Sequence, residues 1–124
     1  MKLTGLVPML ESDDLKGTLR FYRDKLGFAL TGIAPGKKQP YWLSLRRDAV
    51  EIMFTDRNVR SSIQLPTFTG VLYCYPDDVD EMWEELKNKV PIEWPIANFD
   101  YGMREFGIRD NNGYILSFGQ PVEK

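Results

Sequence analysis

Histidine is absent from this chain of 124 residues, and cysteine occurs only once, at Cys74. Without histidine there is no Ser-His-Asp triad, and no pair of histidines to hold ferrous iron beside a carboxylate. One cysteine forms no disulfide within the chain, so cysteine usage does not indicate a redox compartment. Triad hydrolases and ferrous oxygenases are therefore excluded. Carboxylates, hydroxyls and aromatic rings remain as candidate functional groups.

Long apolar runs and clusters of basic side chains are also missing. No stretch approaches the ~20 apolar residues of a transmembrane helix, and residues 1–5 lack the features of a signal peptide. The formal net charge is -2, and lysine and arginine are scattered along the chain, which gives no basic surface for nucleic acid. We expect a cytoplasmic protein with neither a membrane nor a nucleic-acid partner.

The sequence does carry an internal repeat. A shift of 64 positions places Val7 on Val71 and Asp14 on Asp78. The apolar helix positions that follow also match, and they are Leu15, Leu19, Tyr22 and Leu26 in the first copy and Val79, Trp83, Leu86 and Val90 in the second. With 43% hydrophobic residues the chain has material for one domain's core. We predict a single domain, 1–124, with one module at about 1–60 and another at about 66–124.

Each module is predicted to be a strand, a helix and three further strands. The apolar spacing indicates a helix at about 14–26, with Ser12 or Asp13 as its N-cap and Gly27 just past its end. A second helix is predicted to start after Asp77. The further strands are expected at 28–34, 41–45, 50–54, 70–75, 92–96, 104–109 and 114–118.

Three segments together resemble one known superfamily. They are Asp14-Leu-x3-Leu-x-Phe-Tyr-x3-Leu-Gly-Phe28, Asp77-Asp-Val-Asp80 and Tyr101-Gly-Met-Arg-Glu-Phe-x3-Asp-x2-Gly113. The combination is similar to the vicinal oxygen chelate superfamily, which holds glyoxalase I, extradiol dioxygenases and the bleomycin-resistance proteins. The resemblance implies an α+β fold in which two βαβββ modules form paired curved sheets around a cleft.

In the metal enzymes of that superfamily, four inward strand positions hold the ligands. The resemblance carries these positions to Val7, Glu51, Val71 and Ser117, where Ser117 is the counterpart of Glu51. Only Glu51 offers a good metal ligand, and a lone carboxylate does not hold a divalent ion. We therefore expect no metal and no cofactor.

Glu51 and Cys74 each have a functional and a structural interpretation. Glu51 is either a general base or the anionic partner of a cationic ligand, or it forms an ion pair with Arg46, Arg104 or another arginine. Cys74 has no histidine to activate it as a nucleophile. Its parity places it on the face opposite the inward positions of its strand, which favours a buried structural thiol.

The predicted ligand-binding surface combines aromatic rings, methionines and a few polar groups, which are typical of pockets for flat or apolar ligands. An ordinary core or a dimer interface is the alternative for the aromatic rings and methionines. The predicted lining residues are Val7, Met9, Trp42, Ser44, Glu51, Met53, Val71, Tyr73, Phe99, Tyr101, Met103 and Ser117.

The resemblance favours a small-molecule binding protein, similar to bleomycin-resistance proteins, that sequesters a cationic or aromatic ligand. A polar connection at 57–67 and an aromatic-rich loop at 97–103 favour a homodimer whose second copy completes the cleft. Pro8 stands where similar proteins exchange their first strand. One alternative is a metal-independent lyase or isomerase with Glu51 as general base, and another is a structural or regulatory partner domain. The ligand's identity and the mode of exchange stay open.

Overall fold

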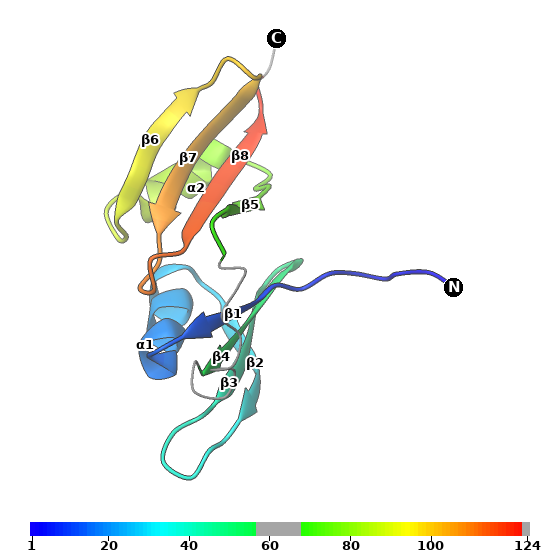
Figure 1. Cartoon of the computed structure of the whole chain (residues 1–124). Helices are drawn as coiled ribbons and strands as arrows, with labels where there is room; N and C mark the ends of the chain where they lie inside the picture. The colour runs from blue at the N-terminus through cyan, green and yellow to red at the C-terminus, as the bar shows by residue number, and fades with distance from the viewer. Residues whose placement is uncertain (57–67, 123–124) are drawn as a thin grey trace. The chain divides into compact units, whose positions relative to one another are not determined.

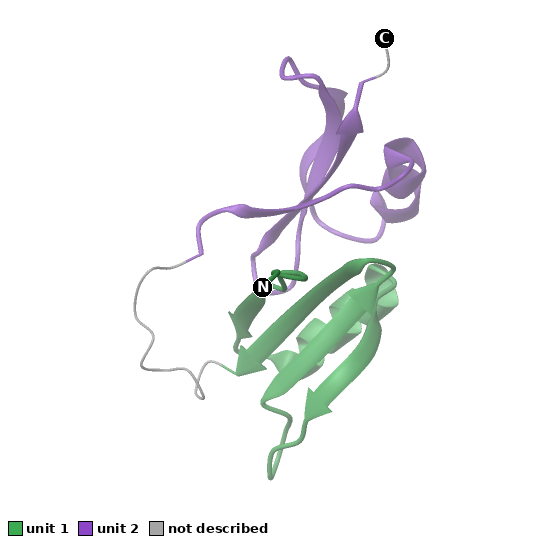
Figure 2. Cartoon of the chain, turned by 90° about the vertical axis from the view of Figure 1, so that its right-hand side faces the viewer, with its two compact units in different colours: residues 1–67 green, residues 68–124 purple. Residues whose placement is uncertain are grey.

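The computed structural model describes residues 1–56 and 68–122, which fall into two compact units. Unit 1 comprises residues 1–67 and unit 2 comprises residues 68–124 (Figures 1 and 2). Each unit holds a four-stranded sheet with helical structure on one face. The predicted α+β class with two βαβββ modules is confirmed. The polar connection predicted at 57–67 lies outside the described residues.

Unit 1 places its first strand beside its last. The sheet order is β1-β4-β3-β2, with β1 parallel to β4 and the other neighbours antiparallel. The elements are β1 (Met9–Ser12), the α-helix α1 (Leu15–Arg20), the π-helical turn η1 (Phe21–Lys25), β2 (Ala29–Ala34), β3 (Trp42–Arg47) and β4 (Val50–Asp56).

Unit 2 repeats this arrangement. Its sheet order is β5-β8-β7-β6, again with the first strand parallel to the last. The elements are β5 (Val71–Cys74), α2 (Val79–Leu86), β6 (Ile92–Asn98), β7 (Met103–Arg109) and β8 (Ile115–Pro121). The repeat in the sequence therefore corresponds to a repeated topology.

The core of each unit lies between its sheet and its helix. In unit 1, Tyr22 is fully buried and its ring centroid lies 5.1 Å from that of Phe54 on β4. In unit 2, the ring of Phe106 on β7 lies 5.2 Å from Trp83 of α2 and 5.2 Å from Phe118 of β8. Because strand side chains alternate between faces, these contacts fix which face of each sheet the helix covers.

The single helix predicted at 14–26 is wrong in its second half. There α1 gives way to η1, in which the amide of Leu26 donates to the carbonyl of Phe21 at 3.3 Å. The wider turn buries both Phe21 and Tyr22, whereas Leu19, on the predicted stripe, is only half-buried. A π-helical turn holds one residue more than an α-helical turn, so the α-helical spacing of core positions ends there.

Both helices begin one residue later than predicted. The side chain of Asp14 accepts from the amide of Gly17 at 2.9 Å, and that of Asp78 accepts from the amide of Glu81 at 3.1 Å. Ser12, one of the predicted caps, instead uses its Oγ to accept from the amide of Asp14 at 3.1 Å. Several residues able to cap a helix stand side by side at each start, and the backbone geometry selects the last of them.

The strand predicted at 92–96 is longer than expected. β6 continues two residues further and passes through Pro95. Proline is tolerated because β6 is an edge strand, whose outer side needs no backbone N–H for pairing. The loop predicted at 97–103 is therefore shortened to 99–102, and its bend uses Gly102 at a φ of 88°.

Candidate functional site

Each sheet has one face packed on the helix of its own unit and an opposite face, which we call the open face. In Figure 1, α2 lies behind the sheet of unit 2, and in Figure 2, α1 lies behind the sheet of unit 1. Because successive side chains of a strand point to opposite faces of the sheet, the residues between the buried core positions lie on the open face. Most of the residues predicted to bind a ligand have this parity.

The open face of unit 1 carries a row of side chains across three strands. Ser44 on β3 lies opposite Met53 on β4, and Met53 lies opposite Met9 on β1. Trp42 and Glu51 share this face, two residues along their strands from Ser44 and Met53. The sheet thus brings together all the binding residues predicted within the strands of unit 1.

Both carboxylate oxygens of Glu51 are engaged. Oε2 accepts from the hydroxyl of Ser44 at 2.8 Å, and Oε1 accepts from Nη2 of Arg46 at 2.7 Å. The hydroxyl of Thr31 donates in turn to Oγ of Ser44 at 3.1 Å. The ion pair with Arg46, which the sequence offered as the structural interpretation of Glu51, is present. The negative charge of Glu51 is therefore balanced by the guanidinium of Arg46.

The open face of unit 2 has a row that runs across all four strands. Tyr73 lies opposite Ser117, Ser117 opposite Gly107, and Gly107 opposite Trp94. The indole of Trp94 lies directly over Gly107, since a Cβ at that glycine would stand 2.5 Å from Cε2 of the ring. The hydroxyl of Tyr73 lies over Gly119 in the same way. The two glycines let both aromatic side chains lie close against the sheet.

Glu105 on β7 is an acidic group of this face that was not among the predicted site residues. It is 4% exposed. The hydroxyl of Tyr73 donates to Oε1 at 2.9 Å and that of Ser117 to Oε2 at 3.3 Å. A hydrogen bond to the same carboxylate raises the pKa of Tyr101 to about 12, and burial followed by the bond to Glu105 raises the pKa of Tyr73. Both phenols therefore stay neutral well above pH 8.

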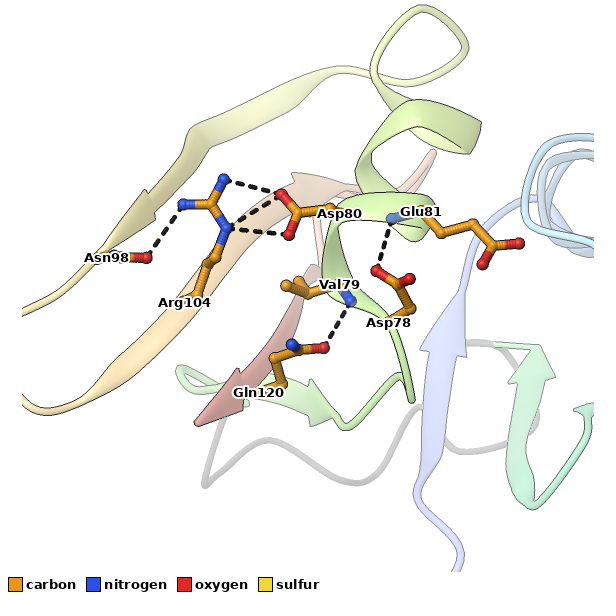
Figure 3. A network of polar contacts seen from close by, with 7 residues as sticks. All are labelled: Asp78, Val79, Asp80, Glu81, Asn98, Arg104 and Gln120. Carbon is orange, nitrogen blue, oxygen red and sulfur yellow. Dashed lines mark hydrogen bonds and ion pairs between the residues drawn. The ribbon is translucent and has the colours of Figure 1, made fainter. Parts of the chain in front are cut away.

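Glu105 has only neutral partners among residues 1–56 and 68–122. The nearest candidate cation along the chain, Arg104, points to the other face of the sheet (Figure 3). There it forms an ion pair with Asp80 of α2 at 2.8 Å and donates to Asn98 at 3.0 Å. The start of α2 is held on that face as well, because Gln120 accepts from the amide of Val79 at 2.7 Å.

Two pairs of aromatic rings each have one member that interacts with this carboxylate. The rings of Tyr73 and Tyr75 are 5.3 Å apart and tilted, and those of Phe99 and Tyr101 are stacked at 5.5 Å. Tyr75 and Tyr101 are 76% and 61% exposed. Phe99 and Tyr101 were predicted to bind. Tyr75 was not, although its aromatic ring follows Tyr73 by two residues and so has the same parity.

The predicted equivalence of Glu51 and Ser117 is wrong. Ser117 faces β5 at the register position at which Met53 faces β1. Glu51 corresponds instead to Ile115, because each of them lies opposite an arginine of the preceding strand. The turn between β7 and β8 is one residue longer than the turn between β3 and β4, whereas the chain that precedes β7 is one residue shorter than the chain that precedes β3. The two differences cancel, so residues of β4 and β8 that correspond are again 64 positions apart in the sequence.

Three predicted site residues lie at or before strand starts. Val7 precedes β1 and is exposed, and the carbonyl of the next residue, Pro8, accepts from the amide of Met53 at 2.9 Å. Val71 and Met103 are the first residues of β5 and β7. These three residues are placed at the ends of the open faces, and Met103 is two residues from Glu105 on the same face of β7.

Cys74 shares its strand parity with Leu72, away from the open face. Burial raises the pKa of its thiol to about 11. The thiolate is the reactive form, so this position suits a structural thiol.

We expect native Cys74 to react with iodoacetamide at pH 8 about 100-fold more slowly than an unperturbed thiol, since its thiolate fraction is lower by about that factor. The measurement is the alkylation rate followed by mass spectrometry, with the same chain in 8 M urea as control. Equal rates in the two conditions would contradict this assignment.

Metal ligands do not gather in the part of the chain that the structure describes. No three Asp, Glu or Cys side chains there are placed so that they could hold a metal ion together. In the same residues, no helix has the length and apolar character needed to cross a membrane.

Comparison with known proteins places the chain in one fold. Residues 8–118 match the family model described as the glyoxalase/bleomycin resistance protein/dioxygenase superfamily. No curated protein sequence matches the chain.

Three solved structures illustrate the range of similar proteins. The bleomycin-binding protein from bleomycin-producing Streptomyces verticillus, complexed with copper(II)-bleomycin, is 22% identical over 99% of each chain, with a TM-score of 0.70. TnmS3, an antibiotic binding protein from Streptomyces sp. CB03234, is 21% identical over 98% of this chain and 99% of its own, with a TM-score of 0.74. The lactoylglutathione lyase from Agrobacterium tumefaciens is 22% identical over 94% and 92%, with a TM-score of 0.69. At such identities the likeness shows the shared fold.

Proposed function

The chain belongs to the glyoxalase/bleomycin resistance protein/dioxygenase superfamily, and we propose that within it this protein sequesters a cationic or aromatic small molecule without transforming it. The observation that carries the proposal is the open face of unit 2, where Tyr73 and Tyr101, each paired with a second aromatic ring, interact with the carboxylate of Glu105. Rings supply contact area and a carboxylate supplies charge, which are the two features that recognition of such a ligand needs. Antibiotic-binding proteins of the same fold support this proposal.

The enzyme alternative relied on Glu51 as general base. A base must reach a substrate proton with an available oxygen, but both oxygens of Glu51 already accept hydrogen bonds, one of them from a guanidinium. Binding without catalysis therefore fits this side chain better. In the lyase version, Glu51→Gln would abolish turnover, whereas we expect it to leave ligand affinity at unit 2 unchanged.

The proposal is tested by looking for the ligand directly. The untagged full chain, purified under non-denaturing conditions, is analysed by native mass spectrometry for a copurifying molecule, and bleomycin is titrated calorimetrically as a first antibiotic probe. A ligand at 100 times its Kd stabilises the fold by about 2.7 kcal/mol, so a thermal-shift panel of cationic, neutral and anionic aromatic compounds widens the search. A panel in which nothing raises the melting temperature, together with no copurifying molecule, would reject ligand binding and favour a structural partner domain.

We also propose that the protein is a cytoplasmic homodimer, and that a second copy completes the cleft. Apolar side chains exposed before β1 and at the start of β5 support this proposal, and they include Leu3, Leu6, Val7 and Val71. Exposed apolar side chains that follow one another along the chain, as Leu6 and Val7 do, are typical of interaction surfaces.

The full chain is expected to sediment as a dimer at micromolar concentration, with an interface on the order of 2,000 Å² in total. Leu6→Asp should shift the protein toward monomer and weaken ligand binding in parallel, because it places a charge in the interface. Lys16→Asp, on the exposed side of α1, is the control and should do neither. A monomer that binds its ligand with undiminished affinity would contradict the shared cleft.

A further inference from the structure

Glu51 on the open face of unit 1 and Glu105 on that of unit 2 differ in the charge of their partners. Glu51 accepts from the guanidinium of Arg46. Glu105 is more deeply buried, and its donors are the hydroxyls of Tyr73, Ser117 and Tyr101. Among the described residues, no lysine or arginine side chain balances its charge. The face of unit 2 therefore has an acidic group that its own strands leave uncompensated.

A carboxylate in this position acts on its surroundings over some distance. Burial removes water that would otherwise screen the charge, so its field decays more slowly than in solvent. Hydrogen bonds from hydroxyls offset part of the cost of burying such a charge, and a nearby cation offsets more of it. Arg104 is held on the opposite face by Asp80 and Asn98. Arg109 shares the parity of Glu105 but is held by Glu93 and by the carbonyl of Gly113. A cation for Glu105 is therefore expected from a ligand.

The aromatic rings of Tyr73 and Tyr101 favour one class of cation. The hydroxyls of Tyr73 and Tyr101 both interact with the carboxylate, and the two side chains are 36% and 61% exposed, so a cation that approaches Glu105 also meets their rings. Ring faces attract cations within about 6 Å, most strongly those that shed water easily. A primary ammonium is strongly hydrated and needs several direct acceptors, and both oxygens of Glu105 already accept from hydroxyls. Bulky alkylated cations do not have this requirement.

We propose that the open face of unit 2 binds a weakly hydrated organic cation, such as a quaternary ammonium attached to an aromatic ring, over the rings of Tyr73 and Tyr101, with Glu105 beneath as its counter-charge. The proposal rests on the proposed function and narrows it to a class of ligand and to one unit. It also assigns the charge recognition to Glu105 rather than to Glu51.

Three probes that share a benzyl group test the inference. The full chain is titrated by amide NMR with benzyltrimethylammonium, benzylammonium and benzyl alcohol, which are respectively a quaternary cation, a primary cation and a neutral compound. We expect the quaternary cation to bind about tenfold more tightly than the other two, and to shift the amides of Tyr73, Tyr101 and Glu105. Equal affinity for the three probes would overturn the proposal.

Charge-neutral and ring variants complete the test. Glu105→Gln keeps the shape and one acceptor but removes the charge, so it should weaken benzyltrimethylammonium by about tenfold and leave benzyl alcohol unchanged. Glu81→Gln, an exposed carboxylate on α2, makes the same change in net charge and should have no effect. Should Glu105→Gln unfold, Tyr101→Leu on the exposed loop gives the second readout, with the same selective loss of the quaternary cation.

The two levels of the proposal fail in different ways. An unchanged affinity in both Glu105→Gln and Tyr101→Leu, or amide shifts confined to unit 1, would reject the role of Glu105 and leave small-molecule binding intact. A chain to which none of the three probes binds, but with which another molecule copurifies, would reject the cation class alone. The absence of any ligand in both experiments would reject the proposed function itself.

Discussion

Replacing Phe106 with alanine is expected to lower the free energy of unfolding by about 3–5 kcal/mol. Phe106 is fully buried on the helix side of β7, where its ring stacks on Phe118 and meets the edge of Trp83. Alanine removes the ring from the centre of the unit 2 core and leaves a cavity that two other aromatic side chains border. Urea unfolding followed by tryptophan fluorescence measures the loss, since Trp83 contacts the substituted ring.

Phe68→Ala is the matched control for this prediction. Phe68 belongs to the same unit and also touches another ring, Tyr114 at 5.9 Å, but it is 41% exposed. Truncating it removes little buried surface, so the expected loss is below about 1 kcal/mol. Equal losses in the two variants would mean that the buried face of β7 has been assigned to the wrong side.

Gly107→Ala is expected to lower the free energy of unfolding by about 1–3 kcal/mol, although it adds only a methyl group. The added Cβ would stand 2.5–2.8 Å from three atoms of the Trp94 indole, so the ring has to move off the sheet. Trp94 is held by packing alone, because its indole N–H is buried and has no hydrogen-bond partner among the described residues. The expected readouts are a lower urea midpoint and an altered tryptophan emission.

Two further variants isolate the cause of this effect. Gly70→Ala places a methyl group at ordinary contact distance from Phe68, and its expected effect lies within about 0.5 kcal/mol. In a Trp94→Ala background, Gly107→Ala should lose most of its effect, since the two residues are directly coupled. If Gly107→Ala lowers the free energy of unfolding by the same amount in the Trp94→Ala background, the effect comes from the backbone of β7 and not from a clash with the indole.

The duplicated topology could be predicted because it depends on local patterns. Apolar spacing marked both helices, and turn residues marked the hairpin at Asp110, whose carboxylate accepts from the amides of Asn112 and Tyr114 at 2.8 Å each. The turn at η1 was not predicted, since Tyr22 and Leu26 suit an α-helical stripe as well as a π-helical one. The resemblance to the superfamily is confirmed.

The binding surface was only partly predictable, because it depends on strand register. Parity correctly grouped Ser44, Met53 and Tyr73 with the open faces. To identify corresponding residues in the two modules, the number of residues in each bulge and turn must be known. An error of two positions in this number paired Glu51 with Ser117.

Glu105 and Trp94 were missed for different reasons. Glu105 lies inside the motif that indicates the family, and its parity with Met103 on β7 is the signal in the sequence that could have identified it. Trp94 becomes a candidate only when Gly107 is known to lie opposite it. That pairing crosses an irregularity in the register of β6, which the sequence does not reveal.

The π-helical turn also explains how two halves of unequal length keep the same strand pairing. The chain has two residues more between Asp14 and Gly32 than between the corresponding Asp78 and Trp94. One extra residue is taken up where η1 widens the helix by a residue in a single turn. The π-helical turn thus accommodates an inserted residue at the end of the helix, so the insertion does not change the register of the next strand. For the same reason, a deletion within Phe21–Lys25 should disturb the sheet of unit 1 less than a deletion within any of its strands.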